Sequence, residues 1–252
     1  MNLHYFNKLL VLLVLVLVLV LFCKETPLLA KTLKFAITSN FAPYHFMDKD
    51  NKPRGIHFDI LSTVINKFGY DLTLVTIPRK RLEINVKKGH QDVFPNALAW
   101  TSDLGNFVYT DTVSHVSDML FTLKNSPLKF TRIEDLFGKK LIAIRGYNYP
   151  MLEPYFKNGM IMRINTEHEL SAMEMLLLKR GDGAVVVDKI GKWLIAKNSW
   201  QGKFKKSNKM ITDTEFRFIF NKKWKDLIPK INKELKALKN NGGLDKILDN
   251  YK

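Results

Sequence analysis

The chain has 252 residues, and its 40 lysines and arginines outnumber its 24 aspartates and glutamates, so the formal net charge is +16. This length accommodates one large domain or two lobes of roughly 100 residues each. The lysines are spread along the sequence, which favours a solvated basic surface over a polyanion-binding patch. No zinc-finger spacing or RNA-recognition motif is present, and we expect no nucleic-acid partner.

Residues 1–30 have the layout of a secretory signal peptide. Lys8 precedes an apolar run of 14 residues, Leu9 to Phe22, which is shorter than the roughly 20 residues that a membrane-spanning helix needs. Because the small residue Ala30 follows, we predict cleavage after it and export to the periplasm. An uncleaved anchor is the alternative, since Leu28 is only a fair residue three places before the cut.

Cleavage after Ala30 would remove Cys23, the only cysteine of the chain. The mature protein would then have no disulfide, no thiol nucleophile and no thiolate metal site. Its net charge would be +15, because two lysines and one glutamate leave with the signal. The six histidines show no metal-ligand spacing, and the sequence contains neither a GxSxG nor a GxxxxGK motif. We therefore expect no metal, no cofactor and no catalytic residues.

The first half of the mature chain has a β-α-β-α-β pattern. Apolar alternation and helical periodicity predict a strand at 33–37, a helix at 56–68, a strand at 72–77, a short helix at 81–88 and a strand at 93–98. Gly69 and Gly89 follow the two helices as C-caps. This order predicts a mainly parallel sheet with helices on both faces.

The pattern begins again after a predicted strand at 119–123. The expected elements are a helical turn at 133–136, strands at 141–144, 160–164, 183–187 and 216–220, helices at 150–156 and 170–179, and a C-terminal helical segment at 227–251 with a break at Gly242 and Gly243. The stretches KTLKFAITSNFAPY and KKLIAIRGYNYP echo each other. This echo indicates two similar halves.

Five segments together resemble the extracellular solute-binding proteins of family 3, the polar amino-acid type of periplasmic binding protein. They are FAPYHF after the opening strand, GIHFDI, GKKLIAIRGYNYP, GDGAVVVDK and the tail KINKELKALKNNGGLDKILDNY. The resemblance implies a two-lobed α/β fold of the type II periplasmic-binding-protein kind, each lobe a mainly parallel sheet flanked by helices. Lobe one would comprise residues 31–120 and 221–252, lobe two residues 125–214, and the hinge strands residues 119–123 and 216–220.

In lobe two, the resemblance implies ligand-binding residues at the ends of two strands. The loop that receives the ligand carboxylate in the family matches Arg145, Gly146, Tyr147 and Asn148. Gly146 would let the backbone approach the solute, and Asn148 would cap the next helix. Asp188 matches the family aspartate that takes the ligand ammonium group. The plain alternatives are an ordinary strand-to-helix turn and a helix cap.

Lobe one departs from the amino-acid pattern in the stretch ALAWTSDL. Ala99 and Leu104 stand where the family has a serine and an arginine, so the usual charged fork for an α-carboxylate is missing. Arg81 resembles an arginine of stand-alone family members and could replace the fork together with Arg145; the alternative is a surface charge on a helix. The aromatic residues expected to wall an apolar slot include Phe41, Tyr44, Trp100 and Tyr147.

The resemblance implies a monomeric, non-enzymatic protein that closes on a small polar ligand bearing a carboxylate, an amino acid or an analogue, for uptake through an inner-membrane ABC permease. Two alternatives stay open: a sensory module for a membrane receptor, and an enzyme on this scaffold, such as a dehydratase. In the enzyme, His57 could be a general base, although a satisfied surface histidine is the simpler expectation.

Overall fold

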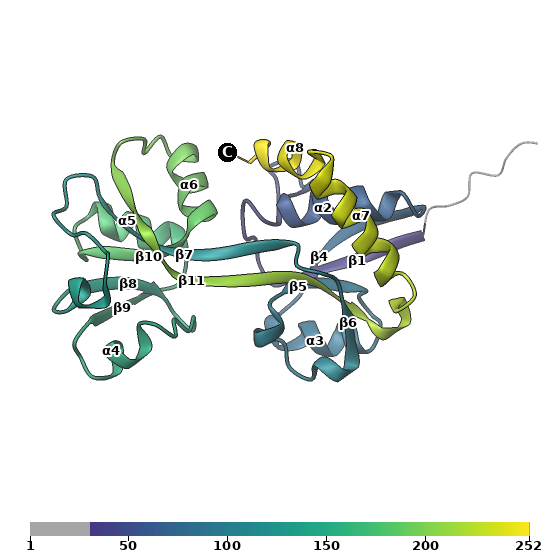
Figure 1. The fold of residues 1–252 in the computed structure, drawn as a ribbon, viewed down its shortest axis with the longest axis horizontal. Coiled ribbons are helices and arrows are strands. Elements are labelled where there is room, and N and C mark those ends of the chain that lie inside the picture. The colour runs from purple at the N-terminus through teal and green to yellow at the C-terminus, as the bar shows by residue number, and fades with distance from the viewer. Residues whose placement is uncertain (1–30, 252) are drawn as a thin grey trace, which may run out of the picture. The chain divides into compact units, whose positions relative to one another are not determined.

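The computed structural model describes residues 31–251, and the predicted signal peptide lies outside them. Figure 1 shows two α/β lobes joined by two long strands, β7 (Ser114–Leu123) and β11 (Phe204–Asn221). Within residues 31–251, no helix combines the length and the apolar character needed to span a membrane.

The first lobe is built around β1, which lies between β4 and β5 in the sheet. Its elements are β1 (Lys31–Ile37), β2 (Phe46–Met47), β3 (Pro53–Arg54), α2 (Ile56–Asn66), β4 (Tyr70–Thr76), α3 (Arg79–Lys87), β5 (Val93–Asn96), η1 (Leu98–Trp100), η2 (Leu104–Asn106) and β6 (Phe107–Tyr109). Strand β1 runs parallel to β5. The predicted β-α-β-α-β order of this half is therefore confirmed.

The second lobe is built around β8, which runs parallel to both of its neighbours, β9 and β10. Its elements are η3 (Ile133–Leu136), β8 (Lys140–Ile144), α4 (Glu153–Lys157), β9 (Met162–Thr166), α5 (Glu169–Leu177), β10 (Gly183–Val187) and α6 (Asp188–Lys197). Apolar clusters lie on both faces of this sheet, with Ile142 and Ala184 in one cluster and Leu141 and Val185 in the other. Alternate residues of each strand therefore face opposite cores, as in a buried parallel sheet.

The long strands extend well beyond the segments predicted for them. Residues 217–221 of β11 pair with β5 and β6, and residues 204–216 pair with β7. The sequence pattern identified only residues 119–123 and 216–220, because buried apolar side chains are dense there, whereas Val116, Phe204 and Ile211 are isolated buried residues in the rest of the two strands. The remaining parts carry polar side chains such as Ser117, Asp213 and Glu215 and hold their strand conformation through the ladder between β7 and β11.

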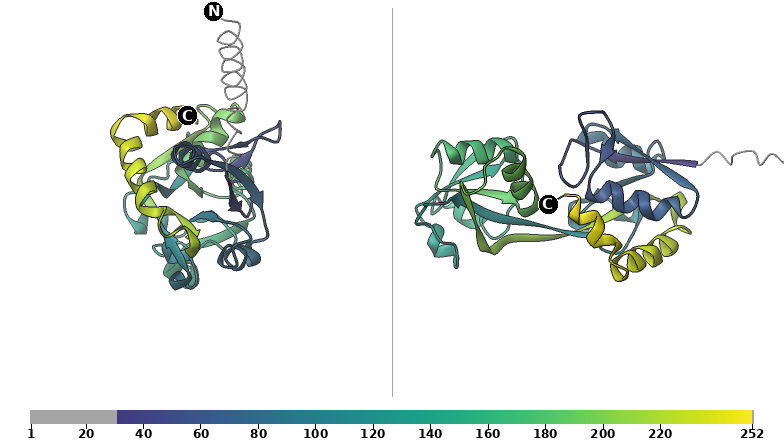
Figure 2. Two further views of the ribbon diagram at one scale, coloured as in Figure 1. Left: turned by 90° about the vertical axis from the view of Figure 1, so that its right-hand side faces the viewer. Right: turned by 90° about the horizontal axis from the view of Figure 1, so that it is seen from above.

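The C-terminal segment returns to the first lobe through η4 (Lys222–Trp224) and ends in helices α7 (Ile228–Asn240) and α8 (Gly243–Asp249), which lie beside α2 (Figure 2). The hydroxyl of Tyr251 donates to Asp59 Oδ2 at 2.6 Å and accepts from the Gly55 N–H at 2.8 Å. These two bonds fasten the end of the chain to the N-terminus of α2.

Gly55 is required where the chain enters α2. Its φ is +122°, and a Cβ added there would lie 2.5 Å from the Tyr44 carbonyl oxygen. We expect Gly55→Ala to lower the free energy of unfolding by more than about 3 kcal/mol, because the clash is with backbone. Gly69→Ala is the matched control: φ is +73° but the space is open, so the loss should be about 1–2 kcal/mol. Equal losses in the two variants, measured by denaturant unfolding, would mean that the contact with Tyr44 does not require glycine.

Candidate functional site

The loop that follows β8 is a tight turn. The Tyr147 N–H donates to the Ile144 carbonyl at 3.2 Å, and Gly146 lies in the left-handed region with φ +79°, which glycine adopts without strain. Arg145, Gly146, Tyr147 and Asn148 are all exposed. The strand-end position predicted for these residues is therefore the observed one.

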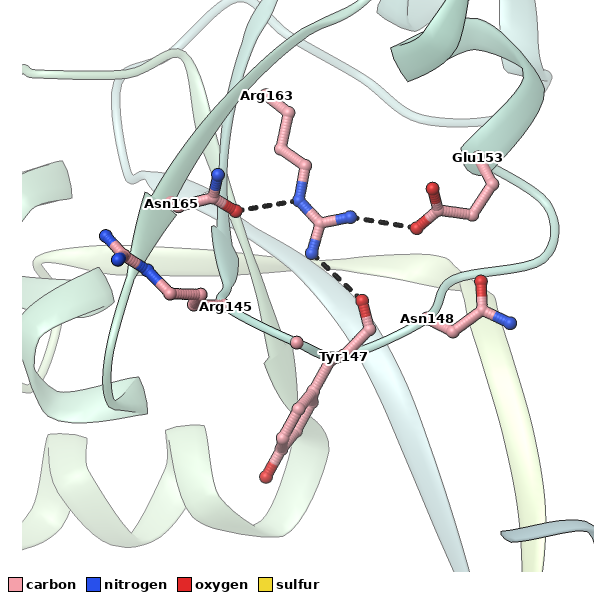
Figure 3. Close-up of a pocket in the computed structure, with 7 residues that line it drawn as sticks. Arg145, Tyr147, Asn148, Glu153, Arg163 and Asn165 are labelled. Carbon is pink, nitrogen blue, oxygen red and sulfur yellow. Dashed lines mark hydrogen bonds and ion pairs between the residues drawn. The ribbon is translucent and has the colours of Figure 1, made fainter.

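The predicted cap by Asn148 is wrong. Helix α4 begins at Glu153 rather than at Pro150, and its N-cap residue is Leu152, which makes no side-chain capping bond. The reason is an additional turn before the helix, in which the Leu152 N–H donates to the Tyr149 carbonyl at 2.8 Å. The Asn148 side chain is thereby left exposed beside the turn (Figure 3).

Arg163 of β9 lies behind this loop and binds it from one side. One guanidinium nitrogen, Nη2, donates to the carbonyls of Ile144 and Tyr147 at 3.0 and 2.9 Å. The guanidinium also donates to Glu153 Oε1 at 2.8 Å and to Asn165 Oδ1 at 2.9 Å (Figure 3). Arg163, Glu153 and Asn165 line a surface pocket of about 440 Å³ together with loop residues 145–148.

Arg145 and Arg81 come from different lobes. Arg145 Nε lies 3.0 Å from Glu167 Oε1, and both side chains are about two-thirds exposed, so this ion pair contributes little to stability. Arg81 is exposed on α3 and has no side-chain partner among residues 31–251. Leu104, which stands at the family's arginine position, lies in η2 and is partly buried.

Asp188 is the first residue of α6, directly after β10, and is half-buried. Its carboxylate lies 2.7 Å from Lys206 Nζ and 2.9 Å from Lys192 Nζ. Burial alone would raise the pKa of Asp188, but the bonds from Lys206 and Lys192 outweigh burial and hold the pKa below its ordinary value. Asp188 is therefore ionised at neutral pH, and its charge already has two cationic partners.

Two further carboxyl groups, Asp118 of the joining strand β7 and Glu169 of the second lobe, were not predicted from the sequence. Asp118 of β7 is only 9% exposed, and burial raises its pKa to about 6 although Thr212 Oγ1 donates to it. Burial also raises the pKa of Glu169, the first residue of α5, whose Oε1 has no hydrogen-bond partner among the described residues. Asp118 had a usable signal, because an acid inside the run SHVSDMLF is unusual for a buried strand.

Negatively charged side chains contribute to the raised pKa values of one tyrosine in each lobe. Burial raises the pKa of Tyr44 in the first lobe, and Asp188, Asp118 and Asp213 raise it further. Burial likewise raises the pKa of Tyr147, with added contributions from Glu169 and Asp118. Asp118 of β7 thus acts on both phenols, Asp188 of α6 and Asp213 of β11 act on Tyr44, and Glu169 of α5 acts on Tyr147. Such an arrangement suits a protonated amine.

The predicted aromatic residues of the first lobe belong to one cluster. Phe41 stacks on Tyr44 with ring centroids 5.3 Å apart, and Trp100 meets Phe216 edge-on at 5.6 Å. His57 joins the two pairs, 4.9 Å from Tyr44 and 5.6 Å from Phe216. Tyr44 is 1% exposed and Trp100 is 49% exposed. The cluster therefore runs from the core to the surface.

The expectation of a surface histidine at position 57 is wrong, because His57 is fully buried. Its Nε2 lies 2.7 Å from Ser114 Oγ, and its ring centroid lies 5.7 Å from that of His45, which is 7% exposed. The Nδ1 atoms of both rings lack hydrogen-bond partners within residues 31–251. Burial lowers the pKa of His57 well below its ordinary value and that of His45 to about 3.

No cluster of three or more histidine, cysteine, aspartate or glutamate side chains in the described part of the chain could hold a metal ion. His57 also lacks a carboxylate partner there, whereas a catalytic histidine is normally oriented by one.

Comparison with known proteins gives one family and many similar structures. The family model of the bacterial extracellular solute-binding proteins, family 3, matches residues 33–252. Substrate-binding domain 2 of GlnP from Lactococcus lactis, in an open conformation, is 23% identical, with 88% of this chain and 95% of that chain covered and a TM-score of 0.69. No curated protein sequence matches significantly.

Two other solved structures have different descriptions. A histidine kinase sensor domain with similarity to periplasmic binding proteins is 19% identical, covers 88% of this chain and 96% of its own, and has a TM-score of 0.69. An ancestral amino-acid-binding protein, a precursor of cyclohexadienyl dehydratase, is 18% identical, covers 87% and 95%, and has a TM-score of 0.67. At these identities the likeness establishes the fold, which is the two-lobed fold expected from the sequence.

The buried histidine pair predicts acid sensitivity. A histidine whose pKa is depressed in the folded state stabilises the protein fully above about pH 6.5, and this stability is lost as the pH falls. Between pH 7.5 and 5, each imidazole that stays neutral in the folded state should cost about 2 kcal/mol of unfolding free energy. Denaturant unfolding at several pH values measures this slope. His57→Phe should reduce the slope, whereas the exposed control His90→Asn should not; an unchanged slope in His57→Phe would contradict the assignment.

Proposed function

Because the chain belongs to family 3 of the bacterial extracellular solute-binding proteins, we propose that it is an exported monomer that closes on a small polar solute and delivers it to an ABC permease. The observation that carries the proposal is that carboxylates act on one tyrosine of each lobe, Asp188 and Asp118 on Tyr44 and Glu169 and Asp118 on Tyr147. The proposed periplasmic location rests on the signal layout of residues 1–30.

The proposed solute carries both an amine and a carboxylate, as an amino acid or a close analogue does. Asp188 would receive the ammonium group, and the buried Asp118 would add an uncompensated negative charge near it. The turn at residues 145–148 would receive the carboxylate through its free N–H groups. Arg145 could add a charged contact at small cost, because its present ion pair with Glu167 is exposed. Arg81 remains the proposed counterpart from the first lobe.

The remaining ligand contacts would come from the aromatic side chains. Phe41, Tyr44 and Trp100 belong to one cluster of the first lobe. Trp100 and Tyr147 are partly exposed, at 49% and 40%, so they offer ring faces that a solute can reach. Tyr44 is 1% exposed and would act chiefly as the wall behind them. Such rings give a small solute apolar contact area while polar groups fix its orientation.

A second candidate is a sensory module read by a membrane receptor. Similarity to a histidine kinase sensor domain favours it, as does Leu104 at the position of the missing arginine. A catalytic role on the same scaffold has weaker support, because the one candidate base, His57, is sealed in the core. Importer and sensor share the binding step, so the same binding measurement tests both.

A thermal-shift screen tests the proposal. The protein, stripped of bound solute, is heated with amino acids, polyamines, keto acids and aromatic carboxylates. A solute at 100 times its Kd adds about 2.7 kcal/mol and should raise the midpoint by roughly 5–11 °C. We expect the strongest shifts from solutes with an amine. No shift with any of these solutes would overturn the proposal.

Asp118→Asn should separate binding from stability. We expect the affinity for an aminated solute to fall roughly tenfold or more, because a desolvated charge is removed. The unfolding free energy at pH 7.5 should rise by up to about 3 kcal/mol, since a carboxyl whose folded pKa is raised to about 6 destabilises the protein above that pH. The exposed Asp226→Asn is the control. An affinity equal to that of the parent protein would remove Asp118 from the site.

A further inference from the structure

Arg163 is anchored in the second lobe far more firmly than a surface arginine. Its side chain is 18% exposed, and its guanidinium carbon lies 5.5 Å from the ring centre of Tyr149 and 5.2 Å from that of Phe156. Its four hydrogen bonds go to Ile144, Tyr147, Glu153 and Asn165. A guanidinium has only five N–H groups. Arg163 is therefore largely satisfied within the chain and is not an open anion site.

The bond to Tyr147 fixes one peptide plane. The only cis peptide in residues 31–251 is Ala42–Pro43, so the Tyr147–Asn148 peptide is trans, and its carbonyl and N–H point in opposite directions. Because Arg163 holds the Tyr147 carbonyl at 2.9 Å, the Asn148 N–H must face away from Arg163. Neither this N–H nor that of Gly146 has a hydrogen-bond partner among the described residues.

The side away from Arg163 is the side on which the proposed solute would lie. Figure 3 shows the Tyr147 side chain leaving the loop opposite the guanidinium. Burial raises the pKa of the Tyr147 phenol, and the charges of Glu169 and Asp118 raise it further. The Asn148 N–H therefore faces the side of the loop on which the Tyr147 side chain lies. A zwitterion could place its carboxylate on the N–H and its ammonium near the carboxylates.

We infer that Arg163 is a positioning residue for solute binding: it holds the Tyr147–Asn148 peptide so that the Asn148 N–H, and not the Tyr147 carbonyl, faces the bound acceptor group. The inference rests on the proposed function. Because Gly146 allows the backbone of the turn a wide range of conformations, the Tyr147–Asn148 peptide can rotate in the absence of Arg163 and turn its carbonyl toward the solute. The guanidinium also polarises the peptide from the carbonyl side, which strengthens the N–H as a donor.

The experiment compares Arg163→Gln with Arg180→Gln, an exposed arginine of the same lobe without a side-chain partner in the described chain. Crystal structures of the parent protein and of the variants show the direction of the Asn148 N–H through the position of the Tyr147 carbonyl. We expect the direction to match the parent protein in Arg180→Gln and to change in Arg163→Gln. Glu153→Gln keeps the acceptor for Arg163 and should keep the parent direction. An unchanged direction in Arg163→Gln would overturn the inference.

Binding is then measured with a mixture of the twenty standard L-amino acids as the probe. Arg163→Gln should need a roughly ten- to hundredfold higher concentration than the parent protein for the same thermal shift, while Arg180→Gln should not differ. If both variants need the same concentration of amino acids for that thermal shift, the inference is also overturned. If the parent protein shows no shift, the proposed function fails, whereas the direction of the N–H still decides the role of Arg163.

Should Arg163→Gln fail to fold, Arg163→Lys replaces it. Lysine keeps the charge and the apolar stem but ends in a single nitrogen instead of a planar fork. Nη1 binds Glu153 while Nη2 binds both loop carbonyls. One ammonium nitrogen cannot replace both, so we expect the direction of the Asn148 N–H to change in this variant as well. A parent-like direction in the folded lysine variant would contradict the inference.

Discussion

The antiparallel ladder between β7 and β11 is the interaction on which the rest of the structure depends. It runs from Phe204 opposite Leu123 to Phe216 opposite Ser114, and β11 then continues into the sheet of the first lobe. The candidate site uses the same ladder: Asp118 lies opposite Thr212, and Ser114, opposite Phe216, contacts the buried His57. A change in this ladder would therefore change the surroundings of the site directly, which suits the proposal that the lobes close on a solute.

The chain as a whole is strongly basic, whereas the charges that act on the two tyrosines of the site are negative. The formal net charge is +16, yet the groups around Tyr44 and Tyr147 are carboxylates. Asp188 has two lysine partners, whereas Asp118 is bound by the neutral hydroxyl of Thr212. A buried carboxyl without a cation is costly, and such groups are often kept for function. In the proposed function, the uncompensated groups, more than Asp188, would give the site a preference for an amine.

The sequence was sufficient for the order of most elements and for the ends of β8 and β10, at Ile144 and Val187, whereas β2, β3, β6 and α6 were not predicted. The echo between KTLKFAITSNFAPY and KKLIAIRGYNYP is explained by β1 and β8, which are the central strands of their lobes. The sequence was insufficient to predict features that depend on contacts between residues far apart in the chain. The burial of His57 depends on Ser114 and Phe216, and the start of α4 depends on an extra turn at Tyr149. The role of Arg163 depends on acceptors up to 19 positions away, which no local pattern reveals.

The central claim is that the two lobes close on a small polar solute, and small-angle X-ray scattering tests it most directly. The radius of gyration of the protein without residues 1–30 is measured alone and with the solute that gives the largest thermal shift. We expect a smaller radius with the solute, and no change with an equal concentration of a solute that gives no shift. A stabilising solute that leaves the radius unchanged would contradict closure.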